Sequence, residues 1–317
     1  MVSVKSKALK DKIKVDRIIG EYTQGLEGPV LIVTAGVHGN EPSGIFGLKR
    51  VFERLEKDQP KIKGALIGVT GNMAALERRV RYIDYDLNRI CKFETVDELR
   101  QSEIYNSSEG KELEEIMEYF DKIKNTYSER YFIDCHTTSS ESQPYISAHD
   151  FQHSVEFASK FPVYTVTGLG KSIPGTMDDY LNFHGFTGFT FESGQHDDLA
   201  SIENHEAVIW LTLTNSGMLD REDIGCYPQC DAILKKTVIE GKKIFQTIYR
   251  YPIGEGEDFK MKPGYVNFQK IEKGEVLAQN EERAVCSDWD ARILMPLYQK
   301  QGSDGFFVVE EVADEQV

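Results

Sequence analysis

Strand-like and helix-like segments alternate along the first two-thirds of the chain, and this alternation constrains the fold more than any other feature. The strand-like runs are KIKVDRI, PVLIVTA, GALIGVT, a run ending in FIDC, PYISA, PVYTVT and FTGFTFES. A run such as PVLIVTA is apolar almost throughout, which is typical of a strand buried on both faces. Strands separated by helices need crossover connections, so we expect an α/β fold with a mixed, mostly parallel sheet flanked by helices.

The segments between these strands have the periodicity of amphipathic helices. After Pro42, apolar side chains recur at helical spacing at Ile45, Leu48, Val51, Phe52 and Leu55. The segment KELEEIMEYFDKIK repeats this pattern, and further helices are predicted around HSVEFASKF and through IENHEAVIWLTLTNSGML. Each of these helices has an apolar stripe with which to cover the sheet.

The pattern changes after about residue 220, where short β-like runs are separated by glycine-containing turns. These runs are GYVNFQKI, GEVLA, RILMPLY and GFFVVEEV. They predict a smaller, β-rich C-terminal domain, and we place the division at residues 1–222 and 223–317. A helix predicted over DAILKKTVIEGKKIFQTI could belong to either side of that division.

The composition excludes several classes of partner. The 317 residues are 40% hydrophobic and 28% charged, as in soluble globular proteins, and the net charge is −15. Binding to nucleic acid or to an anionic membrane needs a concentrated basic surface, so we expect neither partner. A small anionic substrate remains compatible with this charge, because a few arginines in a pocket can outweigh the global field.

The chain also lacks the usual signals for export or membrane insertion. The stretch MVSVKSKALKDKIKVDRIIG has no continuous apolar core of the kind a signal peptide needs, and no run reaches about 18 apolar residues. The five cysteines are scattered, and the CxxxC spacing of Cys226 and Cys230 has no second pair to complete a zinc site. We therefore expect a cytoplasmic protein with free thiols.

A glycine-bracketed turn follows the buried run PVLIVTA and carries two potential metal ligands. In LIVTAGVHGNEPSG, His38 and Glu41 stand three residues apart, and the glycines around them let the backbone bend so that both can reach one ion. The same spacing in HSVE, at His153 and Glu156, falls inside a predicted helix, where a solvated surface is the better interpretation. Nucleotide binding at the turn is disfavoured, because it has neither the P-loop nor the dinucleotide-binding spacing.

A third ligand is predicted where the next suitable strand ends. His136 follows the apolar run FIDC, and parallel strands bring their carboxyl ends to one edge of a sheet. Two histidines and one glutamate, with one coordination position open for water, form the donor set of a hydrolytic zinc site. Zinc is the predicted ion, and cobalt or manganese in its place remain alternatives.

Two further segments carry side chains suited to a substrate. In YIDYDLNRIC, Asn88 and Arg89 could together hold a carboxylate, although Arg89 could instead pair with a nearby aspartate. Glu192 directly follows the aromatic run FTGFTF, where an acidic side chain that is merely exposed to solvent is not expected. Such a carboxylate could take a proton from water at a metal and pass it to a leaving group.

Four motifs in a fixed order resemble a known family. HGNE is followed by RYIDYDLNR, DCHTT and FESG, and this set is similar to the succinylglutamate desuccinylase/aspartoacylase family of the zinc carboxypeptidase superfamily. The resemblance covers roughly residues 28 to 220, with a β-rich C-terminal region of suitable size after them. It implies a zinc carboxypeptidase-like fold, with a C-terminal domain that caps the site.

The resemblance also implies roles for individual residues. His38, Glu41 and His136 would bind one zinc ion per chain, and Arg81 would help to polarise the scissile carbonyl. Beyond the metal, Glu192 would act as general base and then as general acid.

Asn88 and Arg89 would hold the α-carboxylate of a small substrate. The implied activity is hydrolysis of an amide bond in an N-acyl amino acid or a related carboxylate. A carboxypeptidase or esterase that uses the same residues is the alternative, and a non-catalytic metal-binding homologue is a weaker one.

Overall fold

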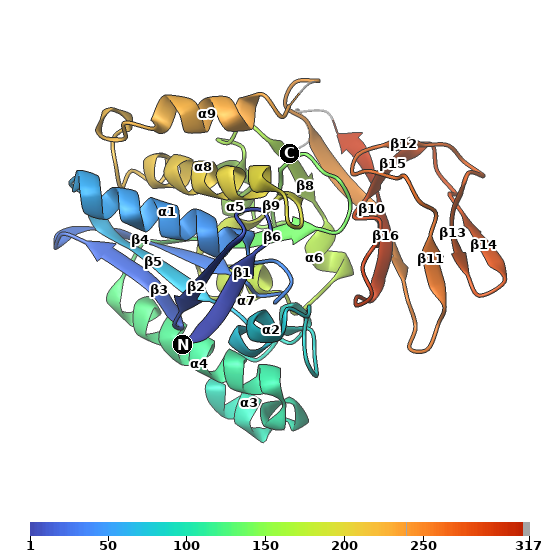
Figure 1. The fold of residues 1–317 in the computed structure, drawn as a ribbon, viewed down its shortest axis with the longest axis horizontal. Helices are drawn as coiled ribbons and strands as arrows, with labels where there is room; N and C mark the ends of the chain where they lie inside the picture. The colour runs from blue at the N-terminus through green and yellow to red at the C-terminus, as the bar shows by residue number, and fades with distance from the viewer. Residues whose placement is uncertain (239, 313–317) are drawn as a thin grey trace.

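The computed structural model describes residues 1–238 and 240–312, and one large mixed sheet runs through most of them (Figure 1). Its eleven described strands follow the order β12-β15-β16-β10-β8-β7-β9-β6-β4-β5-β3. The strands that precede residue 200 are β3 (Ile18–Thr23), β4 (Leu26–Ala35), β5 (Lys63–Thr70), β6 (Arg130–Thr138), β7 (Tyr145–Ser147), β8 (Tyr164–Thr167) and β9 (Thr187–Gln195). Four further strands of this sheet follow residue 200, namely β10 (Ile244–Pro252), β12 (Lys270–Ile271), β15 (Ala291–Leu294) and β16 (Asp304–Val312).

The centre of this sheet is parallel, as the sequence predicts. Strands β5, β4, β6 and β9 run in the same direction, and β7 is antiparallel to β9 but parallel to β8. Successive residues of β4 contribute to two different hydrophobic cores, Leu31 and Val33 to one and Val30 and Ile32 to the other. A strand that buries both faces cannot alternate polar with apolar residues, which explains the continuous apolar run in its sequence.

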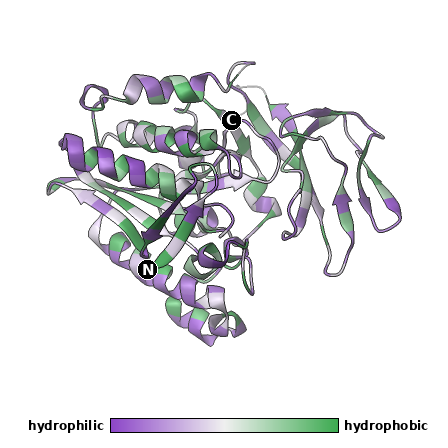
Figure 2. Cartoon of the chain, viewed as in Figure 1, coloured by the Kyte–Doolittle hydropathy of each residue, from purple (hydrophilic) through white to green (hydrophobic). Residues whose placement is uncertain are grey.

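Helices cover both faces of the sheet, so the predicted α/β fold class is confirmed. Helices α1 (Ser43–Asp58), α8 (Leu199–Asn215) and α9 (Tyr227–Lys235) lie together on one side, and α4 (Ser108–Thr126) and α3 (Val96–Gln101) lie on the other (Figure 1). Helix α1 carries polar and apolar residues in alternating bands (Figure 2), as expected for a helix that buries one side and exposes the other. The shorter helices are α2 (Met73–Arg78), α5 (Gln152–Ala158), α6 (Leu169–Ser172) and α7 (Met177–Phe183).

Single-turn 3₁₀ helices lie at η1 (Leu87–Arg89), η2 (Glu103–Asn106) and η3 (Arg221–Asp223).

The predicted strand KIKVDRI is divided in the structure. Its first part is β2 (Asp11–Val15), which forms a hairpin with β1 (Val2–Ser6), and its last residue begins β3.

The helix predicted over DAILKKTVIEGKKIFQTI is wrong in its second half. Helix α9 ends at Lys235, and the following IFQTI belongs to β10, which pairs with β8 on one side and with β16 on the other. Gly241 has a φ of +79°, which a helix interior does not allow, and the aromatic and β-branched residues after it favour a strand.

The C-terminal region is rich in β-structure, as predicted, but much of it extends the main sheet. Strands β10, β16, β15 and β12 continue the sheet beyond β8, and β11 (Phe259–Met261), β13 (Val276–Asn280) and β14 (Arg283–Cys286) form a separate antiparallel sheet. The division at residues 222 and 223 stays a prediction. None of the helices in residues 1–238 and 240–312 combines the length and apolar character that a bilayer crossing requires.

Candidate active site

The site lies at the carboxyl ends of three neighbouring parallel strands. His38 follows β4, His136 lies near the end of β6, and Glu192 lies near the end of β9. The turn after β4 depends on its glycines. A Cβ on Gly39 would come within 2.1 Å of the Ala75 carbonyl carbon, so a larger residue would push the turn away from α2. Gly36, with a φ of +72°, supplies the bend that was predicted, while Gly39 allows the close contact with α2.

The three predicted metal ligands meet at one point. His38, Glu41 and His136 are buried, and one ligand atom from each lies within 4.8 Å of the others. Nδ1 of His38 is 3.0 Å from Glu41 Oε1, and Nδ1 of His136 is 3.2 Å from Glu41 Oε2. The glutamate thus faces the same ring nitrogen of both histidines, across the space that an ion would fill.

Two aspartates bind the opposite nitrogens of these histidines. Asp86 Oδ1 is 3.0 Å from His38 Nε2, and Asp134 Oδ2 is 2.8 Å from His136 Nε2. A carboxylate that accepts the Nε2 proton fixes the tautomer and leaves the Nδ1 lone pair free for a metal. Sequence reasoning missed both aspartates. The signal for Asp134 was present, since residues two apart on a strand share one face.

The chemistry of these donors fits a zinc ion. Nδ1 of His38 is buried without a hydrogen-bond partner, although Glu41 lies next to it. An orphaned buried nitrogen is rare unless another group satisfies it, and an ion bound by His38, Glu41 and His136 would do so. Burial alone would raise the pKa of Glu41, but the two histidines hold it well below its usual range, so this ligand stays ionised.

Glu192 lies beside the metal-binding set. It is the register partner of His136 on the adjacent parallel strand, so the two side chains leave the same face of the sheet about 4.8 Å apart at the backbone. Its Oε2 is buried and has no hydrogen-bond partner among the described residues. Burial raises the pKa of Glu192 to about 8, and the charge of Glu41 adds to this, although His136 opposes it. The Glu192 carboxyl group can therefore gain or lose a proton near neutral pH.

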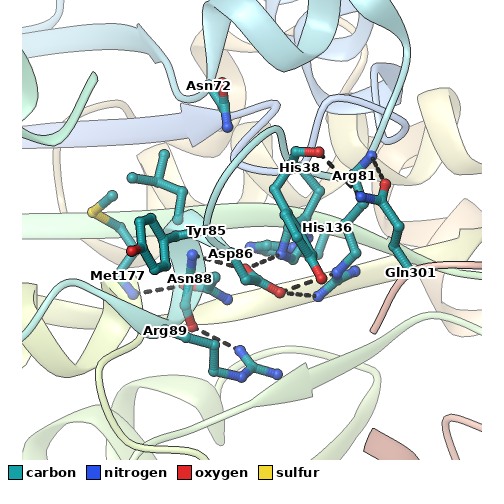
Figure 3. Close-up of polar contacts among 12 residues, drawn as sticks. His38, Asn72, Arg81, Tyr85, Asp86, Asn88, Arg89, His136, Met177 and Gln301 are labelled. Carbon is teal, nitrogen blue, oxygen red and sulfur yellow. Dashed lines mark hydrogen bonds and ion pairs between the residues drawn. The ribbon is translucent and has the colours of Figure 1, made fainter. Parts of the chain in front are cut away.

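Asp86 connects the metal ligands to the arginine of the RYID element (Figure 3). Its Oδ2 lies 3.1 Å from Arg81 Nε and 3.0 Å from a terminal nitrogen of the same guanidinium, while its Oδ1 contacts His38. The guanidinium also lies 3.3 Å from Glu41. Asp86 and Glu41 raise the pKa of Arg81 against the effect of burial, so a fixed positive charge stands next to the three ligands.

Asn88 and Arg89 lie on η1, on the far side of Asp86 (Figure 3). The Asn88 side chain accepts a hydrogen bond from the Met177 backbone at 2.8 Å, which leaves its amide NH₂ for a ligand. Arg89 donates to Asp304 Oδ2 at 2.6 Å, and its Nε is buried without a partner. The alternative considered for Arg89, pairing with an aspartate nearby in sequence, is not what the hydrogen bond shows, since its partner Asp304 lies 215 positions away.

One cavity contains all seven predicted site residues. The residues concerned are His38, Glu41, Arg81, Asn88, Arg89, His136 and Glu192. The C-terminal strands and their connections add further lining side chains, namely Met295, Leu297, Gln299, Asp304 and Phe307. Sequence reasoning had identified none of these five, because the short β-like runs from which they come carry no motif.

The second histidine–glutamate pair with the same spacing lies in the environment expected of it. His153 and Glu156 are exposed on α5, so the second HxxE spacing is a solvated helix face, as expected. All five cysteines, each within the described residues, are free, which agrees with the prediction of reduced thiols.

A mixed α/β sheet with a buried His-Glu-His set at its carboxyl edge defines an α/β protein with a candidate site for one metal ion. Residues 27–209 match the model of the succinylglutamate desuccinylase/aspartoacylase catalytic domain. That match spans more than half of the chain. The chain therefore belongs to the succinylglutamate desuccinylase/aspartoacylase family, a family of hydrolases.

Individual relatives agree with this assignment. A succinylglutamate desuccinylase from Pseudomonas syringae pv. tomato is 27% identical over 281 residues, which cover 85% of this chain and 79% of the relative. The crystal structure of a succinylglutamate desuccinylase/aspartoacylase from Rhodobacter sphaeroides has a TM-score of 0.67 at 16% identity, covering 98% of this chain and 94% of that one. A succinylglutamate desuccinylase from Vibrio parahaemolyticus gives 0.62 at 14% identity, with 97% and 95% covered. At such identities the two structures support the fold alone.

Proposed function

We propose that this protein is a zinc-dependent hydrolase that cleaves the amide bond of an N-acyl amino acid or a related small carboxylate. The observation that carries the proposal is the placement of Glu192 beside His136, with an orphaned carboxylate oxygen next to a preformed His-Glu-His set. Family membership supports the same reaction class.

Each residue then has one task. His38, Glu41 and His136 would hold the zinc ion, which when bound acts as a Lewis acid and lowers the pKa of water. Glu192 would accept the proton of the attacking water and deliver it to the departing nitrogen. Because the substrate nitrogen must leave as a neutral amine, a carboxylate that can hold a proton near neutral pH suits this transfer.

Three further residues would bind the substrate. Arg81 would stabilise the negative charge that develops on the carbonyl oxygen, typically worth several kcal/mol. Arg89 and the Asn88 amide would bind the carboxylate of the substrate and so position its scissile bond next to the metal. We expect the C-terminal side chains that line the cavity to limit the space for a substrate, which would favour a small molecule over a peptide.

The test is a mass-spectrometric screen of N-acyl amino acids, dipeptides and esters with zinc-loaded and with chelated protein. We expect turnover of N-acyl amino acids that disappears on chelation and returns with zinc. Preferential cleavage of dipeptides or esters would replace the proposed substrate class. Absence of turnover across the whole panel would favour a non-catalytic metal-binding protein.

A further inference from the structure

One buried carboxylate in the cavity has no part in the proposed reaction. Asp178 lies in the first turn of α7, is only 7% exposed, and lines the same cavity as Glu192. Its Oδ1 accepts hydrogen bonds from the Thr176 hydroxyl and from the Asp179 backbone. No hydrogen bond from a described residue reaches Oδ2. Oδ2 is not sealed off from the cavity, so it is available to a ligand that could pair with this mostly buried carboxylate.

Hydroxyl side chains of the sheet line the same cavity as Asp178, alongside apolar ones such as Ile173. Thr190 lies two residues before Glu192 on β9 and therefore on the same face of the sheet, about 7 Å further in. Ser147 on β7 is its register partner, and both hydroxyl residues line the cavity. Thr190, Ser147, Thr176 and Asp178 all line the cavity, and because Thr190 lies further from the strand end than Glu192, we call these four residues its inner end.

This inner end is joined to the segment that would bind the carboxylate. The Asn88 side chain accepts the Met177 backbone N–H at 2.8 Å, and the Gly175 carbonyl accepts from Cys91 N at 2.9 Å. A Cβ on Gly175 would stand 2.6 Å from the Arg89 carbonyl oxygen, so the two segments are in close contact. A ligand carboxylate at Arg89 and a ligand group at Asp178 would therefore belong to the same half of the substrate.

The charges of the cavity do not favour a second carboxylate in the half of the substrate that would contact Arg89 and Asp178. Among its described lining residues, Arg81 and Arg89 are the permanently cationic side chains. Arg81 already pairs with Asp86 and Glu41, and Arg89 pairs with Asp304. Asp178 itself would repel an anion. A cation near Asp178, in contrast, would be paired in a site shielded from water.

Building on the proposed function, we propose that Asp178, with the hydroxyls of Thr190 and Ser147, binds an ammonium group on the side chain of the substrate. The substrate class is then an Nα-acyl diamino acid, whose α-carboxylate binds Arg89. Burial, together with the charges of Asp134 and Asp179, raises the pKa of Asp178, so a bound cation would favour its ionised form. An acyl glutamate or acyl aspartate would place its second carboxylate against this residue.

The experiment compares three side chains of similar length on zinc-loaded protein. The substrates are the Nα-acetyl and Nα-succinyl derivatives of ornithine, norvaline and glutamate. Wild-type kcat/KM is expected to follow the order ornithine, norvaline, glutamate. In Asp178→Asn the ratio of kcat/KM for the ornithine derivative to kcat/KM for the norvaline derivative should fall about ten- to hundredfold. This is the size expected for the loss of one charge-assisted hydrogen bond.

The neighbouring residue gives a matched control. Asp179→Asn removes a carboxylate from the same helical turn, but that carboxylate contacts His149 and the Gly175 backbone. The ornithine-to-norvaline ratio of this variant should equal that of wild type, with thermal unfolding used to check that both variants fold. A wild-type preference for the glutamate derivatives, or equal ratios in both variants, would overturn the proposal.

A binding measurement separates this inference from the proposed function. Calorimetric titration of zinc-loaded Glu192→Gln with free ornithine, norvaline and glutamate requires no turnover. Tighter binding of ornithine that is lost on adding Asp178→Asn would support the cationic subsite, even if no acyl substrate is cleaved. Tighter binding of glutamate would refute it, even if the protein is an active hydrolase.

Discussion

His136 and Glu192 are register partners on the adjacent parallel strands β6 and β9, so a candidate metal ligand and an orphaned carboxylate stand side by side on one rigid surface. Both strands are buried in the middle of the sheet, and neither residue is on a mobile loop. Such a pair is held in place by the backbone ladder, which is how a fold can position a base next to a metal.

Replacing the proposed base should abolish turnover without loss of metal. We expect Glu192→Gln to lower kcat/KM by a factor of about 10² to 10⁴, because proton transfer loses its acceptor while the three ligands are unchanged. The control is Glu156→Gln, which alters the exposed HxxE pair on α5 and should have wild-type kinetics. Rate assays paired with zinc analysis test this, and a fully active Glu192→Gln would exclude the residue as base.

The aspartates behind the histidines should control zinc affinity. Asp134→Asn removes the carboxylate that orients His136, and we expect zinc affinity to fall about 10- to 100-fold. Competition with a chromogenic chelator measures this affinity. Asp150→Asn, at a partly exposed carboxylate that pairs with Lys171 and not with a ligand histidine, is the control and should bind zinc as wild type does. Unchanged affinity in Asp134→Asn would argue that Nδ1 of His136 is not a ligand.

The contribution of Glu192 to the stability of the zinc-free protein should become less favourable as pH rises. The folded-state pKa of Glu192 is about 8, above the ordinary value of 4.5, so between these values the folded state binds more protons than the unfolded state. The contribution of Glu192 to the free energy of unfolding therefore decreases with pH across that window. Relative to wild type, zinc-free Glu192→Gln should gain a few kcal/mol at pH 8 and almost nothing near pH 4.5.

Urea unfolding of chelated wild type and Glu192→Gln at several pH values measures that difference directly, since other titrating groups cancel. Zinc brings positive charge close to Glu192 and should shrink the difference between the two proteins. A difference that does not vary with pH would mean that Glu192 has an ordinary pKa in the folded protein.

Arg89 should contribute more to substrate binding than to chemistry. Its two terminal guanidinium nitrogens donate hydrogen bonds to Asp304 and to the Asn88 carbonyl. A lysine has a single ammonium nitrogen and cannot make both bonds with this geometry. We expect Arg89→Lys to raise KM for an N-acyl amino acid about 10-fold with a smaller change in kcat. Arg100→Lys, at an exposed arginine paired with Glu114, is the control. Loss confined to kcat would place Arg89 in the reaction itself and not in binding.

Local patterns explain why the fold and the ligand set were readable from the sequence. Buried parallel strands such as β4 carry unbroken apolar runs, and His38 and Glu41 fall in the glycine-containing turn after one of them. His136 and Glu192 also end apolar runs. Because parallel strands align their carboxyl ends, placing each residue on its own strand was enough to predict that they meet.

Contacts between distant segments were not readable in the same way. Asp304 pairs with Arg89 across 215 residues, and no local pattern marks either as the partner of the other. Asp178 resembles any acidic residue in the first turn of a helix, where the helix dipole alone accounts for it. The segment that forms β10 was misread because its apolar spacing suits a helix until Gly241 and the pairing partners β8 and β16 are considered.

The most direct test of the central claim is a titration of zinc into chelated protein, with bound zinc and hydrolysis of an N-acyl amino acid measured on the same samples. The account predicts a rate that rises in proportion to bound zinc and saturates at one ion per chain, and Glu41→Gln should show neither binding nor rate at the same zinc concentrations. Full turnover by chelated protein, or wild-type zinc binding by Glu41→Gln, would contradict it.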